Sequence, residues 1–114
     1  MSEKKNPWAI ENGIARGTLI NGMKIGEKVH KEFELRECTT EDMLDAESEA
    51  SVMNPLNFAS QLMVRQFVRV GDFKGPFTIG HIKRLKPVDW RLLRAVQGEL
   101  DAVGEAGSAS GGQP

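Results

Sequence analysis

The stretch Val64-Arg65-Gln66-Phe67-Val68-Arg69-Val70-Gly71 is the most apolar part of the chain, and it ends in a glycine. A helix start precedes it, because Asn54 can cap a helix and Pro55 suits the first helical position, where no backbone N–H is needed. Between these signals apolar residues recur at steps of three and four; they are Leu56, Ala59, Leu62 or Met63, Phe67 and Val70. The spacing predicts one helix over residues 55–70, with Gly71 as its C-cap.

This predicted helix is apolar over more than half of its circumference. Phe58, Val64 and Val68 lie outside its main apolar stripe. A helix with a single buried face would carry polar residues at such positions. We therefore expect the helix to pack on two sides, with the excess apolar side against a neighbouring subunit or another protein. Full burial of all three side chains within one monomer would contradict this.

Upstream, residues 14–37 favour β-strands. Apolar and polar residues alternate late in this segment, as in a half-buried antiparallel strand; the apolar ones are Val29, Phe33 and Leu35. The expected partner strand contains residues 18–20. Asn21-Gly22 is the stronger hairpin dipeptide, whereas a turn at Gly26-Glu27 gives strands of more equal length. We favour the turn at Gly26, with a bulge or bend at Asn21-Gly22.

A second helix is predicted between the strands and the central helix. Thr39 is followed three residues later by Asp42, which is the pattern of a capping box. The helix should cover residues 40–52, and its expected buried side consists of Met43, Leu44, Ala46 or Glu47, and Ala50. The opposite face is acidic and is interpreted as solvated or as facing a basic partner; it carries Asp45, Ser48 and Glu49.

After Gly71 the sequence predicts a loop that carries two aromatic residues, Phe73 and Phe77. Thr78 then caps a short helix over residues 79–85. The last helix should cover residues 87–103, and Gly104 should end it. The overall expectation is an α+β fold, with an N-terminal antiparallel β-hairpin followed by a bundle of three to four helices.

A chain of 114 residues allows one small domain. We assign residues 14–103 to that domain. Residues 1–13 are predicted to be a flexible segment. The composition of residues 104–114 is typical of a disordered Gly/Ser-rich tail, because it offers too little apolar surface to offset the entropy of ordering.

Composition disfavours several classes of protein. Fifteen Lys and Arg against sixteen Asp and Glu give a net charge of −1, so no global field draws the chain to nucleic acid or anionic lipid. The single cysteine, Cys38, excludes an internal disulfide and suits a reducing cytoplasm. The chain has no secretory signal and no apolar run long enough to span a membrane.

Catalytic and cofactor chemistry is not predicted. His30, His81 and Cys38 are isolated in the sequence, whereas a metal site needs clustered ligands. The acidic residues 41–49 lack the alternating oxygen ligands and central glycine of a calcium loop. No serine or cysteine occurs in a nucleophile motif. We expect a non-enzymatic protein without a cofactor or metal.

One alternative is a small helix-turn-helix-like DNA-binding regulator formed by the last two predicted helices. Its phosphate contacts would be Lys83, Arg84, Lys86, Arg91 and Arg94. Against this interpretation, the second of these helices is crowded with apolar groups such as Trp90, and no base-reading Asn or Gln lies near its start.

Residues 33–47 read Phe-Glu-Leu-Arg-Glu-Cys-Thr-Thr-Glu-Asp-Met-Leu-Asp-Ala-Glu, and three later blocks follow in order: residues 65–71, 75–79 and 85–89. This succession resembles the tail assembly chaperones of Mu-like contractile-tailed phages and prophages. The similar passage in that family runs leucine-arginine-glutamate-proline-threonine before an aspartate-leucine pair. Here Cys38 replaces the proline, and the section before Thr18 is longer than expected.

The resemblance implies a protein of the bacterial host cytoplasm that binds the helical tape measure protein during tail morphogenesis, until tail tube protein polymerises around it. Partners would be the tape measure protein, the tail tube protein and further copies of the chain, with no membrane or nucleic acid. A structural virion tail component is the remaining alternative. Candidate partner-binding residues are Phe58, Val68, Phe73, Phe77 and Trp90 as anchors, with Arg65 and Arg69 at the rim; the competing interpretation of each aromatic is core packing.

Overall fold

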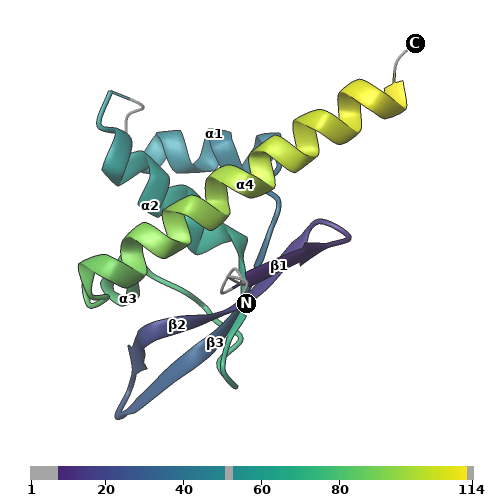
Figure 1. Cartoon of the computed structure of the whole chain (residues 1–114). Helices are drawn as coiled ribbons and strands as arrows, with labels where there is room; N and C mark the ends of the chain where they lie inside the picture. Colours follow the sequence, from purple (N-terminus) through teal and green to yellow (C-terminus); the bar gives the residue numbers. More distant parts are fainter. Residues whose placement is uncertain (1–7, 51–52, 113–114) are drawn as a thin grey trace.

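A computed structural model describes residues 8–50 and 53–112, and the side chains as far as residue 102. It confirms the α+β class, with helices on one side of an antiparallel sheet (Figure 1). The elements are β1 (Trp8–Glu11), β2 (Ile14–Ile25), β3 (Lys28–Arg36), α1 (Thr40–Glu49), α2 (Pro55–Gln66), β4 (Phe67–Val70), α3 (Ile79–Lys83) and α4 (Pro87–Gly112).

The sheet has the order β1-β2-β3-β4, and each neighbouring pair is antiparallel. Strand β1 corrects the prediction of a flexible N-terminal segment from residue 8 onward, because Trp8 to Glu11 pair with β2. The turn between them is Asn12-Gly13, with φ of 57° and 76°. Positive φ at both positions is the geometry that favours Asn-Gly in two-residue hairpins, so this dipeptide was the missed signal. Residues 1–7 lie outside the described part.

The β2–β3 hairpin turns at Gly26, as predicted, and Gly26 has a φ of 65°. The strand register shifts between Thr18 and Met23, which places the predicted bulge at Asn21-Gly22. Gly22 has a φ of 100°, and a methyl group added there would collide with Val29. Glycine is therefore required at this bulge for both conformational and steric reasons.

The central helix is shorter than predicted. Helix α2 ends at Gln66, and Phe67–Val70 forms strand β4 instead of the last helical turn. The Phe-Val-Arg-Val sequence suits a strand, and pairing with β3 satisfies backbone groups that the helix would have satisfied internally. Gly71 consequently ends a strand, and its N–H donates to the carbonyl of Glu32 at 2.6 Å.

Helix α1 starts with the predicted capping box. The Asp42 N–H donates to Oγ1 of Thr39, and the Thr39 N–H donates to the Asp42 carboxylate. The helix ends at Glu49 rather than at residue 52, and residues 51–52 lie outside the described part. Ala46 and Ala50 are buried as predicted. The expected burial of Met43 and Leu44 is wrong, because α1 packs on α2 through its small residues and these two side chains point to solvent.

Helix α4 runs to Gly112 and therefore passes Gly104, where the sequence predicted its end. Glycine lowers helix propensity but keeps its N–H, so a helix can continue through it, which a proline would prevent. Figure 1 shows the last turns of α4 extending beyond the other helices and the sheet. Disorder of residues 104–114 in solution stays a prediction.

The core lies between the sheet and the helices. The sheet contributes Ala15, Leu19, Met23, Phe33, Leu35, Phe67 and Val70, and the helical half contributes Met63, Ile82, Leu85, Leu92, Leu93, Val96 and Leu100. The other face of the sheet carries a cross-strand row of charges, in which Glu34 accepts a hydrogen bond from Arg16 on β2 and forms an ion pair with Arg69 on β4. Within the described residues, no helix is both long and apolar enough to cross a bilayer.

Candidate partner-binding surfaces

The predicted partner-binding residues lie in several different environments. Phe58 and Arg65 are on α2, Val68 and Arg69 are on β4, and Trp90 is on α4. Phe73 and Phe77 belong to the loop before α3. Phe58 and Val64 are only half-buried and Val68 is exposed, so the three side chains outside the predicted stripe are not fully buried in the monomer.

Phe58 lines a groove of about 260 Å³ between α2 and α4. Its other lining residues are Pro55, Ala59, Leu62, Arg94, Gln97 and Asp101. The α2 side of this groove is apolar, whereas α4 contributes a cation, an amide and a carboxylate. Leu56, which follows the lining residue Pro55 in the first turn of α2, is 63% exposed. This is an apolar concavity with a polar margin, which suits side chains of a partner helix.

Two buried glutamines hold the floor of this groove. The Gln97 side-chain amide donates to Gln66 Oε1 at 2.8 Å and to the Ala59 carbonyl at 3.2 Å. Gln66 donates in turn to the Arg36 carbonyl at 2.8 Å, and Gln97 Oε1 accepts from Arg94 at 3.1 Å. The bonds connect α4, α2 and β3 directly. A satisfied buried network of this kind fixes the relative position of the two groove walls.

Arg36 extends the network to α1. Its guanidinium donates to both carboxylate oxygens of Asp42, at 2.8 and 3.3 Å, and to the Arg65 carbonyl at 2.6 Å. The Arg36 hydrogen bonds lower the pKa of Asp42, against the opposing effect of burial. Arg65 itself is not a free rim cation, because its guanidinium donates back to the carbonyl and side chain of Gln61.

The loop aromatics form a cluster with one another. The ring centroids of Phe77 and Phe67 are 4.9 Å apart, and those of Phe73 and Phe77 are 5.0 Å apart. His81 lies 5.3 Å from Phe73, and its Nδ1 accepts from the Thr78 N–H at 3.0 Å. Burial and the nearby Arg84 lower the pKa of His81. Phe77 and Trp90 also pack on the core, which favours a packing role for these two candidates.

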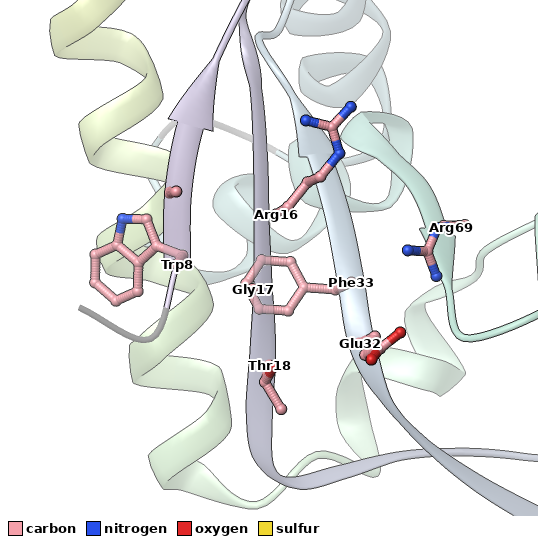
Figure 2. A pocket seen from close by; sticks show the side chains of 8 residues that line it. Trp8, Arg16, Gly17, Thr18, Glu32, Phe33 and Arg69 are labelled. Atoms are coloured by element: carbon pink, nitrogen blue, oxygen red, sulfur yellow. The ribbon is translucent and has the colours of Figure 1, made fainter. Parts of the chain in front are cut away.

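A second hollow, of about 380 Å³, lies on the sheet, and Gly17 is among its lining residues. Figure 2 shows Trp8 on one side of Gly17 and Glu32 and Arg69 on the other. Arg69 is engaged here, because it pairs with Glu34 at 3.3 Å and donates to the Gly71 carbonyl. The hollow therefore carries mixed, largely neutralised charge and gives no preference for a charged ligand.

Sequence reasoning missed Asp89. This fully buried side chain in the first turn of α4 accepts three backbone N–H groups from the β2 bulge: Ile20 at 2.6 Å, Asn21 at 2.8 Å and Gly22 at 2.9 Å. The available signals were an acid two residues after Pro87 and a bulge that leaves N–H groups unpaired. The contact between Asp89 and the bulge is a tertiary contact between residues about 70 positions apart in the chain. Neither sequence signal by itself therefore predicts this contact.

Comparisons with known proteins identify the family of this chain. A family model described as tail assembly protein gp41 matches residues 19–113. The "Mu-like prophage FluMu protein gp41" of Haemophilus influenzae is 34% identical over 83 residues, which is 62% of this chain and 65% of the relative. The chain thus covers slightly less than two thirds of that relative. No solved structure matches. The family match extends over most of the chain, and the protein therefore belongs to the tail assembly protein gp41 family of Mu-like phages and prophages.

Proposed function

We propose that this tail assembly protein is a chaperone that binds the tape measure protein in the bacterial host cytoplasm during tail morphogenesis. The observation that carries the proposal is the groove between α2 and α4, a concave apolar surface on a protein of a tail assembly family. A largely helical client can place apolar side chains in such a groove at steps of three and four residues.

The groove suits this role in three respects. Phe58 and Leu62 provide apolar contact on α2, and Arg94 and Asp101 can pair with polar groups that flank a client's apolar stripe. The Gln66–Gln97 hydrogen bond fixes the relative position of the two walls before any client arrives, which limits the entropy that binding must offset. In the chaperone role, the client's apolar surface is covered until tail tube protein replaces the chaperone.

The test is co-expression of the full chain with the tape measure protein of the same phage, followed by co-purification. We expect Phe58→Glu to abolish capture, because a carboxylate would be buried against the client's apolar stripe. The matched control is Val68→Glu, which places the same charge at an exposed apolar site on β4 and should leave capture unchanged.

Failure of the unmodified chain to capture the tape measure protein would overturn the proposed function. Salt-sensitive retention of duplex DNA in its place would support the DNA-binding alternative. Loss of capture with Val68→Glu but not with Phe58→Glu would keep the function and move the binding surface to the β4 edge.

A further inference from the structure

The net charge of the chain is close to zero, but acidic and basic residues are concentrated in different parts of it. Six of the sixteen acids and none of the fifteen Lys and Arg lie within residues 37–64, which leaves ten acids against fifteen bases in the remainder. Residues 37–64 contain α1 and nearly all of α2. The helical hairpin is therefore strongly negative, and the rest of the molecule is positive.

Helix α1 combines this charge with exposed apolar groups. Met43 is 45% exposed and Leu44 is 62% exposed. Around them are exposed acids, Glu41, Asp45, Glu47 and Glu49. The fifth acid of the helix, Asp42, is buried and paired with Arg36. We call Met43, Leu44 and the four exposed acids the acidic surface.

A second exposed apolar group surrounds the β2 bulge. Ile20 and Val29 are 55% and 56% exposed, and Val88 is 37% exposed. They belong together, because Val29 packs against Gly22 while Asp89, next to Val88, binds the N–H groups of residues 20–22. Exposed cations surround them: Lys24, Lys28, Lys31, Arg84 and Lys86. We call Ile20, Val29, Val88 and these five cations the basic surface.

Several contacts place the cations of the basic surface near its apolar centre. Lys24 pairs with Val29 across the hairpin, and Lys31 also approaches Gly22. Arg84 and Lys24 line one cavity with Gly26. Two acids lie near this surface. Asp89 is fully buried and directed at the backbone N–H groups of the bulge, so its carboxylate is not exposed to a partner, and Glu27 at the turn adds one negative charge beside five exposed cations.

The two surfaces lie at opposite ends of the molecule. In Figure 1, α1 lies at one end and the turn of the β2–β3 hairpin at the other, with α2 and the sheet between them. One molecule cannot bring its own two surfaces together, because the packed core separates them. Each surface therefore remains available to another molecule.

We propose that copies of this chain associate head to tail, with the acidic surface of one copy on the basic surface of the next. Each surface pairs exposed apolar residues with the charge that the other surface lacks. Opposite charges would fix the register, and Met43 and Leu44 would lie against Ile20, Val29 and Val88. The unbranched Met43 can adapt its shape to such a contact.

This contact is heterologous, since two different surfaces meet, so it leaves one free surface of each kind at the ends of every assembly. It continues into short chains of copies unless the rotation between neighbours closes a ring. The groove between α2 and α4 is lined by other residues, so the inference is independent of what that groove binds.

The first test is sedimentation of the purified full-length protein at concentrations up to about 1 mM and at two salt concentrations. We expect the average mass to rise with concentration at 50 mM salt. Raising the salt to 500 mM should weaken association by about tenfold or more, because screening shortens the range of the charge interaction. A protein that stays monomeric at low salt over the whole range would overturn the inference.

The second test is a charge exchange between two variants. Asp45→Lys/Glu47→Lys makes the acidic surface positive, and Lys28→Glu/Lys86→Glu makes the basic surface negative. Each variant alone should be monomeric where the unmodified protein associates. An equimolar mixture should associate again, because each variant then offers the surface that the other needs. A mixture that stays monomeric, or single variants that associate as before, would contradict the proposed contact.

Two controls test whether a loss of association is caused by loss of this contact. Circular dichroism melting shows that each variant is folded; all four positions are exposed, so we expect little change in stability. Leu44→Ser changes no charge and should also weaken association, whereas Leu56→Ser, an equally exposed leucine outside both surfaces, should not. Equal loss with both serine variants would point to non-specific apolar association and overturn the inference.

Discussion

Asp89 shows how one side chain can determine both the shape of a strand and the position of a helix. Its carboxylate accepts the N–H groups of Ile20, Asn21 and Gly22, which the bulge withdraws from the β-ladder. Backbone donors left without a partner inside a protein are strongly destabilising. The same carboxylate is near the N-terminus of α4, where the helix dipole favours negative charge.

We expect Asp89→Ala to lower the free energy of unfolding by about 3 kcal/mol, since three N–H groups lose their acceptor. Urea denaturation followed by circular dichroism measures this. The control, Asp72→Ala, removes an exposed acid and should change stability by less than about 0.5 kcal/mol. Similar values for the two variants would mean that water replaces the carboxylate at little cost.

His81 makes stability depend on pH near neutrality. Burial and Arg84 lower its pKa in the folded protein, so the unfolded chain binds the proton more readily. Stability should therefore be complete above the unfolded pKa of about 6.5 and should decrease as pH falls through the folded pKa. Protonation also removes the Nδ1 lone pair that accepts from the Thr78 N–H.

The comparison to make is the melting temperature at pH 7.5 and pH 5 for the unmodified protein and for His81→Gln. Glutamine can still accept the Thr78 N–H but does not titrate in this range. The decrease between the two pH values should be smaller in the variant. An unchanged decrease would assign the pH dependence to other groups.

At the scale of elements, the change from α2 to β4 occurs at Gln66. Its side chain is fully buried and bonds both Gln97 and the Arg36 carbonyl, so the last residue of the helix is fixed to β3 as the strand begins. Arg69 and Val70 then pair with Glu34 and Phe33 of β3. Val68 is the extra residue where the register shifts, which accounts for its exposure.

Gln66→Leu should reduce the free energy of unfolding by about 1–3 kcal/mol, because Gln97 and the Arg36 carbonyl lose hydrogen-bond partners in a buried site. Gln61→Leu, the same substitution five residues earlier on a less buried face of α2, is the matched control and should have a smaller effect. Chemical denaturation of both variants checks this. If Gln61→Leu is the more damaging change, the glutamine network does not hold the groove walls.

At the scale of the whole molecule, charge and apolar surface are arranged along the line from α1 to the β2–β3 turn. The groove between α2 and α4 is the client site that we propose, and the acidic and basic surfaces form the proposed contact between copies. These two kinds of binding are compatible. A long client covered by many copies would be protected better if neighbouring copies also bound each other, which is the avidity expected of linked sites.

Contact between copies should raise the number of copies that bind one client. The variant Asp45→Lys/Glu47→Lys should still co-purify with the tape measure protein, but with fewer copies per client at low protein concentration. Mass measurement of the purified complexes checks the ratio. An unchanged ratio together with head-to-tail association of the free protein would mean that the contact between copies plays no part on the client.

The sequence alone determined the local structure wherever adjacent residues settle it. Thr39 and Asp42 specify the start of α1, because a capping box involves only three residues of separation. The turn at Gly26 and the bulge at Asn21-Gly22 follow from glycine conformation and strand length. The order of segments, and with it the family, was also contained in the sequence.

Only the tertiary structure decided the rest. Residues 67–70 satisfy a helical period as well as a strand period, and the free edge of β3 selects the strand. Met43 and Leu44 follow the pattern of a buried face, but α2 accepts the smaller Ala46 and Ala50. The role of Asp89 depends on the contact between α4 and the β2 bulge, where its carboxylate accepts backbone N–H groups. In each case the deciding partner is distant in the chain, and local periodicity contains no information about it.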